Sequence, residues 1–238
     1  SQDPVKEFDF LGITLQYEMC YTNVLQVLDL AQIPLKATDR GEDCPVVIGG
    51  GPCSYNPEPL ADFFDIFYIG EGETRYRELI TLYEDCRDRN LGRAEFLRRA
   101  AKLPGLYVPR FYDVTYREDG TIERFFPLEE GIPDTIVKEI VMDLTDACYP
   151  TKPVIPFIKV TQDRLVLEIQ RGCIRGCRFC QAGQLYRPVR ERDVETLKKY
   201  ALEMLDGTGY EEISLSSLSS RDYSRLPELV DFLIEECS

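Results

Sequence analysis

Three apolar runs in the sequence lead directly into glycine, and this recurrence is the feature that most restricts the fold. They are "CPVVIGGGP" at residues 44–52, "DIFYIGEGE" at 65–73 and "RLVLEIQRG" at 164–172. Short apolar runs that end in glycine turns, with helical patterns between them, are typical of parallel strands joined by helical crossovers. Ligands in such sheets bind beyond the carboxyl ends of the strands. The glycine turns are therefore the first places to look for a site.

The rest of the chain fits the same α/β pattern. Residues 8–16 form another apolar strand, and the residues after it recur at helical spacing, with Thr22 or Asn23 as the expected helix cap. Residues 105–128 alternate and contain "EDGT", which indicates a hairpin. Asp222 is expected to cap the last helix. We also predict a strand at 210–220 and helices at 57–64, 74–102, 192–205 and 222–237.

This pattern divides the chain into three parts. Residues 1–75 predict a Rossmann-like parallel-sheet domain that is incomplete at its N-terminal side. Residues 76–163 predict a connecting region of helices and a hairpin, irregular from residue 129. Residues 164–238 read as strand, loop, helix, strand and helix, which is typical of the first part of a β/α barrel. Two strands cannot close a barrel, so we expect an open sheet edge and self-association of this fragment.

Charge and composition exclude several classes of function. The formal net charge is −14, which argues against a general nucleic-acid groove. No apolar run is long enough to cross a membrane, and no signal peptide is recognisable, so we expect a cytoplasmic protein. Histidine is absent, which excludes histidine metal ligands and histidine-dependent nucleophiles. Nine cysteines in a reducing compartment favour metal binding over disulfides.

Three of the cysteines, Cys173, Cys177 and Cys180, lie within eight positions of a glycine-broken, arginine-rich loop after the strand at 164–172. One interpretation is a buried helix face, because their spacing is helical. Gly172 and Gly176 disfavour it, and so do Arg175 and Arg178 among the cysteines. A second is a zinc site, which requires four ligands. The candidates for the fourth ligand are Cys148, the nearest upstream cysteine, and Cys237 near the end of the chain.

The third interpretation is an iron–sulfur cluster with one open iron. Full ligation of a cubane cluster uses four thiolates, so three leave one iron free to bind another chelator. Arginines and the backbone N–H groups of a glycine-rich loop stabilise an anionic cluster. At the carboxyl end of a first barrel strand, the metal would lie where barrel active sites are found.

The motif "CIRGCRFC", with Phe179 before its last cysteine, closely resembles the cluster loop of radical S-adenosylmethionine (SAM) enzymes. The segments "CQAGQLYRPVRER" and "VVIGGGPCSYNPEPLADFFDIFYIGEGE" resemble the subgroup that joins a cobalamin-binding, Rossmann-like domain to a radical SAM barrel. This resemblance implies that the three cysteines hold a 4Fe–4S cluster and that SAM chelates the fourth iron. Reductive cleavage of SAM would then yield a 5′-deoxyadenosyl radical that takes hydrogen from a substrate. The sequence identifies neither that substrate nor a catalytic side chain.

The resemblance also implies roles for other residues. Phe179 either contacts the adenine through its backbone or packs within the loop. Arg190 and Arg192 either meet the SAM carboxylate or lie at a solvated helix start. The family binds the SAM amino group after the second barrel strand, often with Gly-Gly-Glu, where this chain has "SLSSLSS". The hydroxyls or carbonyls expected to replace that motif belong to Ser216, Ser217 and Ser219.

A cobalamin site follows from the resemblance less directly. The loops that would line the pocket for the nucleotide tail contain Gly49, Gly50, Gly51, Gly70 and Gly72, which equally fit tight turns. Many cobalamin domains carry D-x-H-x-x-G, whose histidine ligates cobalt, and this chain has no histidine. We therefore expect no tight cobalamin binding. The competing functions are a zinc-stabilised module whose arginines bind an anionic partner, and a non-catalytic scaffold.

Overall fold

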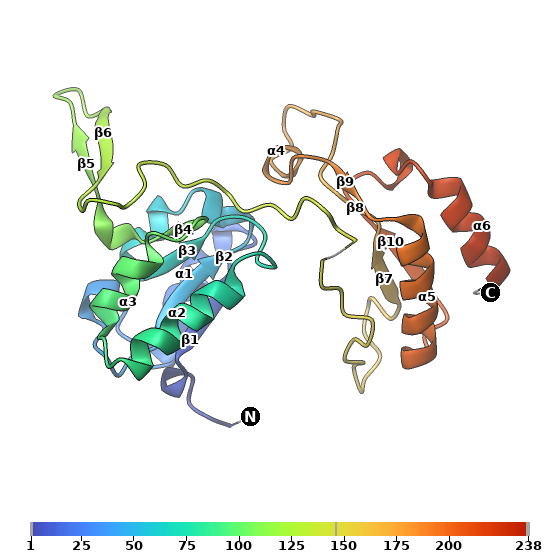
Figure 1. The fold of residues 1–238 in the computed structure, drawn as a ribbon, viewed down its shortest axis with the longest axis horizontal. Coiled ribbons are helices and arrows are strands. Elements are labelled where there is room, and N and C mark those ends of the chain that lie inside the picture. The colour runs from blue at the N-terminus through green and yellow to red at the C-terminus, as the bar shows by residue number, and fades with distance from the viewer. Residues whose placement is uncertain (1, 146, 237–238) are drawn as a thin grey trace. The chain divides into compact units, whose positions relative to one another are not determined.

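A computed structural model describes residues 2–145 and 147–236 of the chain. The chain forms two compact units, residues 1–140 and residues 141–238. Each unit has its own hydrophobic core. The whole is a mixed α/β structure, which agrees with the predicted class (Figure 1).

The first unit is built on a four-stranded sheet in the order β1-β2-β3-β4. The strands β1 (Phe10–Thr14), β2 (Val46–Gly50) and β3 (Ile66–Tyr68) are parallel, as predicted. The fourth strand, β4 (Leu106–Tyr107), is antiparallel to β3, with Phe67 opposite Tyr107. This strand lies at the start of the alternating stretch 105–128, which was expected to form a hairpin, and it pairs with β3 instead.

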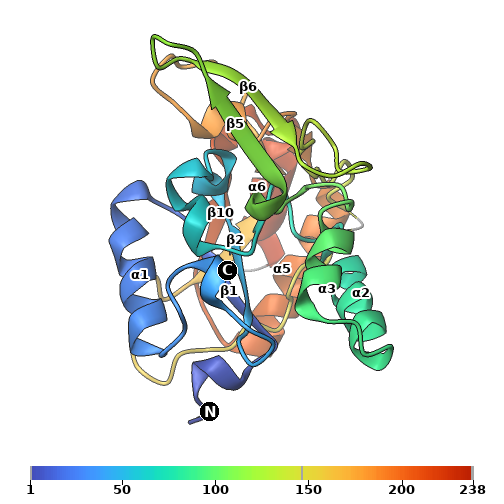
Figure 2. The same ribbon diagram turned by 90° about the vertical axis from the view of Figure 1, so that its left-hand side faces the viewer.

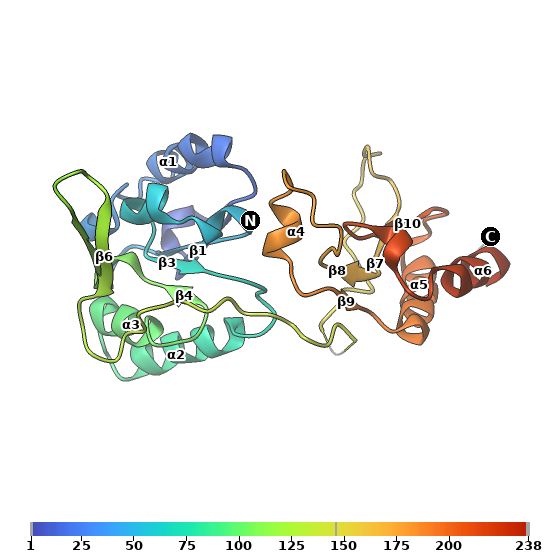
Figure 3. The ribbon, with the colours of Figure 1, turned by 90° about the horizontal axis from the view of Figure 1, so that it is seen from above.

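Helices cover both faces of this sheet. Figures 2 and 3 show α1 (Tyr21–Leu30) on one face, and α2 (Tyr76–Asp88) and α3 (Arg93–Ala100) on the other. Leu28 on α1 and Leu97 on α3 are fully buried. The expected caps of α1 are wrong: Thr22 and Asn23 lie inside the helix, which begins directly after the turn Glu18–Cys20.

The "EDGT" turn closes a hairpin, as predicted. Strands β5 (Tyr112–Tyr116) and β6 (Ile122–Pro127) pair antiparallel, and Gly120 takes the positive φ of +81° that the turn requires.

The predicted helix at 57–64 is a 3₁₀ helix, Glu58–Phe63. Further 3₁₀ turns are Val5–Glu7, Glu18–Cys20, Ala37–Asp39, Pro52–Tyr55, Pro109–Phe111 and Ser220–Asp222.

The second unit contains two small sheets. Strand β7 (Leu165–Glu168) is parallel to β10 (Ile213–Ser216), and β8 (Gln170–Arg171) is antiparallel to β9 (Arg190–Glu191). Its helices are α4 (Ala182–Leu185), α5 (Val194–Thr208) and α6 (Leu226–Glu236). Helix α5 begins at an Asp193 cap, whose carboxylate accepts from the N–H of Thr196, and it packs on β7.

The division between the units differs from the predicted domains. The predicted connecting region 76–163 is split at residue 140, and its helices belong to the first unit. The physical reason is burial, because Leu79, Phe96 and Leu97 complete the core of the first unit. The described part of residues 129–164 has no helix or strand, as expected, apart from an isolated bridge between Glu139 and Gly70.

No helix within residues 2–145 and 147–236 combines the length and the apolar character that a membrane crossing requires.

Candidate metal and cofactor site

The three clustered cysteines lie on an irregular loop, residues 172–181, that follows β8. The helical interpretation of their spacing is wrong. Gly172 and Gly176 have φ of +86° and +63°, the left-handed region, which an α-helix does not accommodate. A helix, α4, begins only at Ala182, after the last of these cysteines. This loop is called the cysteine loop below.

The cysteine loop directs backbone donors at two of its sulfurs. The N–H of Arg175 donates to the Sγ of Cys173 at 3.4 Å, and the N–H of Gly183 donates to the Sγ of Cys180 at 3.4 Å. Such donors stabilise thiolate sulfur over thiol. Cys173 is buried, Cys180 is partly exposed and Cys177 is exposed. Phe179 is 91% exposed, so it does not pack within the loop as one interpretation held.

The two kinds of metal site differ in the arrangement of ligands that they require. Among the described residues, no three or more cysteine, aspartate or glutamate side chains converge to hold a single ion, as tetrahedral zinc demands. Cys148 is exposed, and Cys237 lies outside the described residues. In a 4Fe–4S cluster each thiolate binds a different iron, so the sulfurs need not converge on one point.

The start of the cysteine loop is packed tightly against the segment before β9. A Cβ atom at Gly172 would lie 2.7 Å from the carbonyl oxygen of Pro188 and 2.8 Å from that of Tyr186. Contacts this short are not tolerated, so only glycine fits here. This close approach fixes where the chain leaves β8 and where Cys173 lies.

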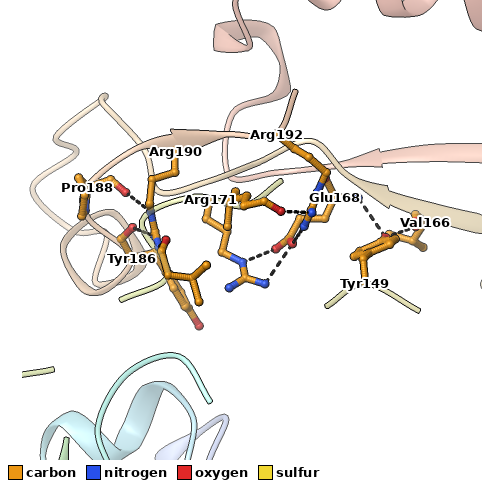
Figure 4. A network of polar contacts seen from close by, with 10 residues as sticks. Tyr149, Val166, Glu168, Arg171, Tyr186, Pro188, Arg190 and Arg192 are labelled. Carbon is orange, nitrogen blue, oxygen red and sulfur yellow. Dashed lines mark hydrogen bonds and ion pairs between the residues drawn. The ribbon is translucent and has the colours of Figure 1, made fainter. Parts of the chain in front are cut away.

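Arg190 binds the same two carbonyl oxygens (Figure 4). It is 6% exposed, and its guanidinium donates to the carbonyl oxygens of Pro188 at 2.9 Å, Tyr186 at 3.1 Å and Val141 at 2.7 Å. The expectation of a solvated helix start is therefore wrong for Arg190. Its donors bind main-chain carbonyls, which is the arrangement of a structural arginine.

Arg192 is more deeply buried, with 1% of the residue exposed. Its guanidinium donates to the carbonyl oxygens of Leu144 and Glu168 and forms an ion pair with the Glu168 carboxylate at 3.2 Å. It also lies over the rings of Tyr149 and Tyr200, 4.9 Å and 5.7 Å from their centroids. A solvated position is wrong for this residue too.

Glu168 joins this buried arginine to the cysteine loop. Besides Arg192, its carboxylate accepts from the Nε of Arg171 at 2.8 Å and from a second Arg171 nitrogen at 3.2 Å (Figure 4). The hydroxyl of Tyr149 donates to the carbonyl oxygen of Val166 at 2.6 Å and accepts from the N–H of Glu168 at 3.2 Å. Arg171 directly precedes Gly172, so the network fixes the approach to the cysteines.

The serines expected near the SAM amino group follow β10. Ser216 ends that strand and is exposed, while the hydroxyls of Ser217 and Ser220 lie 2.9 Å apart within hydrogen-bonding distance. The carbonyl oxygen of Ser219 accepts from the Nε2 of Gln170 at 3.2 Å. Gln170 is 2% exposed, and its Oε1 has no partner among the described residues. Because β7 and β10 are parallel, this turn and the cysteine loop lie at the same edge of the sheet.

Asp222 does not cap a helix, which corrects the expectation for this residue. Its carboxylate forms a two-pronged ion pair with Arg175 of the cysteine loop, with the Arg175 Nε at 2.8 Å from Oδ2. The guanidinium of Arg175, with a further hydrogen bond from Ser219, lowers the pKa of Asp222. Helix α6 begins later, at Leu226.

The glycines of the first unit have packing roles. A Cβ at Gly49 would lie 2.8 Å from the ring of Phe67, and one at Gly72 would lie 2.5 Å from the ring of Tyr76. Gly51 and Gly70 have positive φ, and a Cβ at Gly70 would overlap the backbone of Glu139. Gly50 is less restricted, since its nearest contact would be the Tyr76 hydroxyl at 3.8 Å. These packing roles support the interpretation of tight turns.

A pocket of about 440 Å³ lies at the carboxyl ends of β2 and β3, but none of these glycines lines it. Ser54 follows β2 and Ile69 follows β3 in its wall. Its remaining lining residues are Tyr55, Pro57, Tyr107, Phe125, Ile136 and Lys138.

Sequence reasoning missed Gln170, Glu168 and Asp222 as members of this region. The signal for the first two was available, because both are polar residues in an otherwise apolar strand segment. The pairing of Asp222 with Arg175, 47 positions away, left no local signal.

Two family models match the chain: "Radical SAM proteins, N-terminal" over residues 1–109 and "Radical SAM superfamily" over residues 167–237. An uncharacterised protein of Methanocaldococcus jannaschii is 29% identical over 232 residues, which are 97% of this chain and 43% of that protein. The chain thus spans less than half the length of this curated relative.

Solved structures with a similar fold include OxsB, a cobalamin-dependent S-adenosylmethionine radical enzyme, with aqua-cobalamin and S-adenosylmethionine bound. The TM-score is 0.59 at 17% identity, over 98% of this chain and 29% of that one. TsrM, a radical S-adenosylmethionine methyltransferase from Kitasatospora setae with cobalamin and a 4Fe–4S cluster bound, gives 0.50 at 13% identity, over 97% and 41%. At these identities the similarity concerns the fold alone.

Proposed function

Because this chain belongs to the radical SAM proteins, we propose that Cys173, Cys177 and Cys180 hold a 4Fe–4S cluster whose fourth iron is left for SAM. The observation that carries the proposal is the cysteine loop itself, which presents three thiols, no fourth, and backbone donors to two of the sulfurs. When bound and reduced, the cluster supplies the electron that splits SAM into methionine and a 5′-deoxyadenosyl radical.

The chain's own contribution is to place and tune that centre. The N–H groups of Arg175 and Gly183 reduce the negative charge on the sulfurs that they contact. The packing at Gly172 and the Glu168 network fix the start of the cysteine loop. The Oε1 of Gln170, which has no partner within residues 2–145 and 147–236, and the serines after β10 supply acceptors for the amino group of SAM.

The test is anaerobic reconstitution of residues 1–238 with iron and sulfide, followed by metal and sulfide analysis. We expect about four iron atoms and four sulfides per chain. Replacement of each loop cysteine by serine should lower both. The matched control is Cys148→Ser, which removes an exposed cysteine of the same unit and should leave loading unchanged.

Zinc is the alternative outcome of the same experiment. If the protein binds zinc and no sulfide, and the three loop variants lose this zinc, the zinc-stabilised module replaces the cluster as the explanation of the site. Iron loading without SAM cleavage to 5′-deoxyadenosine by the longer protein would favour the non-catalytic scaffold.

Cobalamin needs a separate proposal, because OxsB and TsrM are described with it. We expect residues 1–238 not to bind it tightly, since the chain has no histidine to ligate cobalt and protein atoms pack closely against Gly49, Gly51, Gly70 and Gly72. Titration with hydroxocobalamin should leave the cobalamin spectrum unchanged. A stoichiometric spectral shift would contradict this expectation.

A further inference from the structure

The cysteine loop is tied to the turn after β10, which comprises residues 217–222 and is called the serine turn below. The first tie is the Arg175–Asp222 ion pair, in which two guanidinium nitrogens face the two carboxylate oxygens. A guanidinium matched in this way to a carboxylate fixes orientation as well as distance. Only 14% of the Asp222 side chain is exposed, against 55% for Arg175.

Other contacts hold the serine turn at its middle and its end. The carbonyl oxygen of Ser219 accepts from the Nε2 of Gln170 at 3.2 Å and from the N–H of Asp222 at 2.9 Å. Tyr223, directly after the turn, is 3% exposed, and its hydroxyl donates to the carbonyl oxygen of Arg192 at 2.9 Å. The position of the turn is therefore defined by β8, by Arg192 directly after β9 and by the cysteine loop.

We propose that Arg175 and Asp222 are positioning residues, whose ion pair holds the serine turn against the cysteine loop so that the two loops form one binding surface for SAM. This inference rests on the proposed function. The ion pair should affect the affinity for SAM and not the binding of iron, because neither side chain belongs to the expected ligands of the cluster.

The exposure of the pair separates this role from a role in overall stability. Arg175 is more than half exposed, and an ion pair at such a position adds little to the free energy of unfolding. Its effect is local: without it, the serine turn gains freedom that SAM binding must then remove.

The test uses Arg175→Gln, Asp222→Asn and the charge swap Arg175→Asp with Asp222→Arg. The matched control is Arg178→Gln, which removes an exposed charge from the same loop, where Arg178 forms no ion pair in the part of the chain that the structure describes. Each protein is reconstituted anaerobically, its iron and sulfide are counted, and SAM is titrated while the electron paramagnetic resonance spectrum of the reduced cluster is followed.

We expect unchanged iron loading in all variants, and a SAM dissociation constant raised about five- to tenfold in the two single variants. The swap should restore most of the affinity, and Arg178→Gln should match the wild type.

Unchanged SAM affinity in the single variants would overturn the inference, as would an equal loss in Arg178→Gln. Failure of the swap to rescue would show direct contact with SAM and also overturn it. A wild-type protein that takes up no iron overturns the proposed function, and this inference falls with it.

Discussion

Arg192 is the buried centre of the network that joins Glu168, Tyr149 and Tyr200. Its guanidinium is fully buried against the stacked rings of Tyr149 and Tyr200 and is bonded to Glu168 and to two carbonyl oxygens. A buried charge is tolerated only when it is paired and its hydrogen-bonding groups are satisfied. Its removal leaves buried carbonyl oxygens without a donor.

We therefore predict that Arg192→Leu lowers the free energy of unfolding by about 2–4 kcal/mol. The loss is below that of a fully orphaned pair, because Glu168 keeps Arg171 as a partner. Chemical denaturation followed by circular dichroism measures it. Lys199→Leu is the control, since Lys199 is 72% exposed in a helical ion pair, and it should change stability by less than about 0.5 kcal/mol. Equal effects would contradict the assigned role of Arg192.

Tyr223 gives a prediction for alkaline pH. Burial, with the nearby charges of Glu191 and Asp193, raises its pKa to about 12. The folded state thus keeps a proton that the unfolded chain releases near its ordinary pKa of about 10. The stability from this group is complete below about pH 10 and is lost as pH rises toward 12.

In Tyr223→Phe this titration is absent, so the free energy of unfolding should fall less steeply above about pH 10 than in the wild type. At neutral pH the variant should lose about 1 kcal/mol with the hydrogen bond to Arg192. Urea unfolding at a series of pH values provides the comparison. Tyr17→Phe, at a residue that is 57% exposed, is the matched control. Parallel curves for the wild type and Tyr223→Phe would refute the prediction.

At the residue scale, the sequence indicated which side chains belong to the site better than it indicated which groups they contact. The cysteine motif and the lack of histidine were readable directly, and the positive φ of Gly172 and Gly176 agrees with a loop. For Arg190 and Arg192 the alternatives were contact with the SAM carboxylate and a solvated helix start that faces Glu191 and Asp193. Their burial depends on Val141 and Leu144, nearly 50 positions away, and no local pattern reports such contacts.

At the scale of elements, the glycine-terminated strands were the most reliable part of the prediction. Strands β2, β3 and β7, whose apolar runs lead into glycine, lie within their predicted ranges, because a buried strand needs an unbroken apolar run and a turn to end it. Strands β1 and β10, which no glycine turn follows, also lie within their predicted ranges. Helix starts were less predictable, as α1 shows, since a capping side chain is a preference and not a requirement. The expected connecting region failed as a unit because α2 and α3 pack into the first core.

The two glycines of the cysteine loop allow a graded test of how the loop is held. Gly172→Ala places a methyl group against the carbonyl oxygens of Tyr186 and Pro188 and strains a φ of +86°. At Gly176 the φ is +63°, but the nearest atom is the flexible end of Arg187 at 3.9 Å. Both changes strain the backbone, and only the first also meets a rigid neighbour.

We expect Gly172→Ala to take up less than about half the iron of the wild type after anaerobic reconstitution, because the loop must leave β8 by another path. Gly176→Ala should retain most of it, at a cost of about 1 kcal/mol in backbone strain. Iron and sulfide analysis beside the serine variants measures both. If the two alanine variants loaded equally, close packing at Gly172 would not be what positions the cysteines.

At the scale of the whole molecule, the two units differ in how completely they are built. The first has a four-stranded sheet with helices on both faces, and Val47, Ile66 and Phe67 at its centre are fully buried. The second has only two-stranded sheets in its described part. It also exposes the apolar side chains of Val154, Phe157 and Ile158, and Phe157 is fully exposed. Unpaired strand edges and exposed apolar runs both favour association.

We therefore predict that residues 1–238 self-associate in a concentration-dependent way, while residues 1–140, which contain the complete first core, remain monomeric. Sedimentation velocity over a tenfold or wider concentration range measures both. The double variant Val154→Ser with Phe157→Ser separates the two causes: if the apolar segment drives association, the variant is monomeric, and if the strand edges of β7 and β10 drive it, association persists. A wild-type chain that stays monomeric at the highest concentration would show that neither feature recruits a second copy.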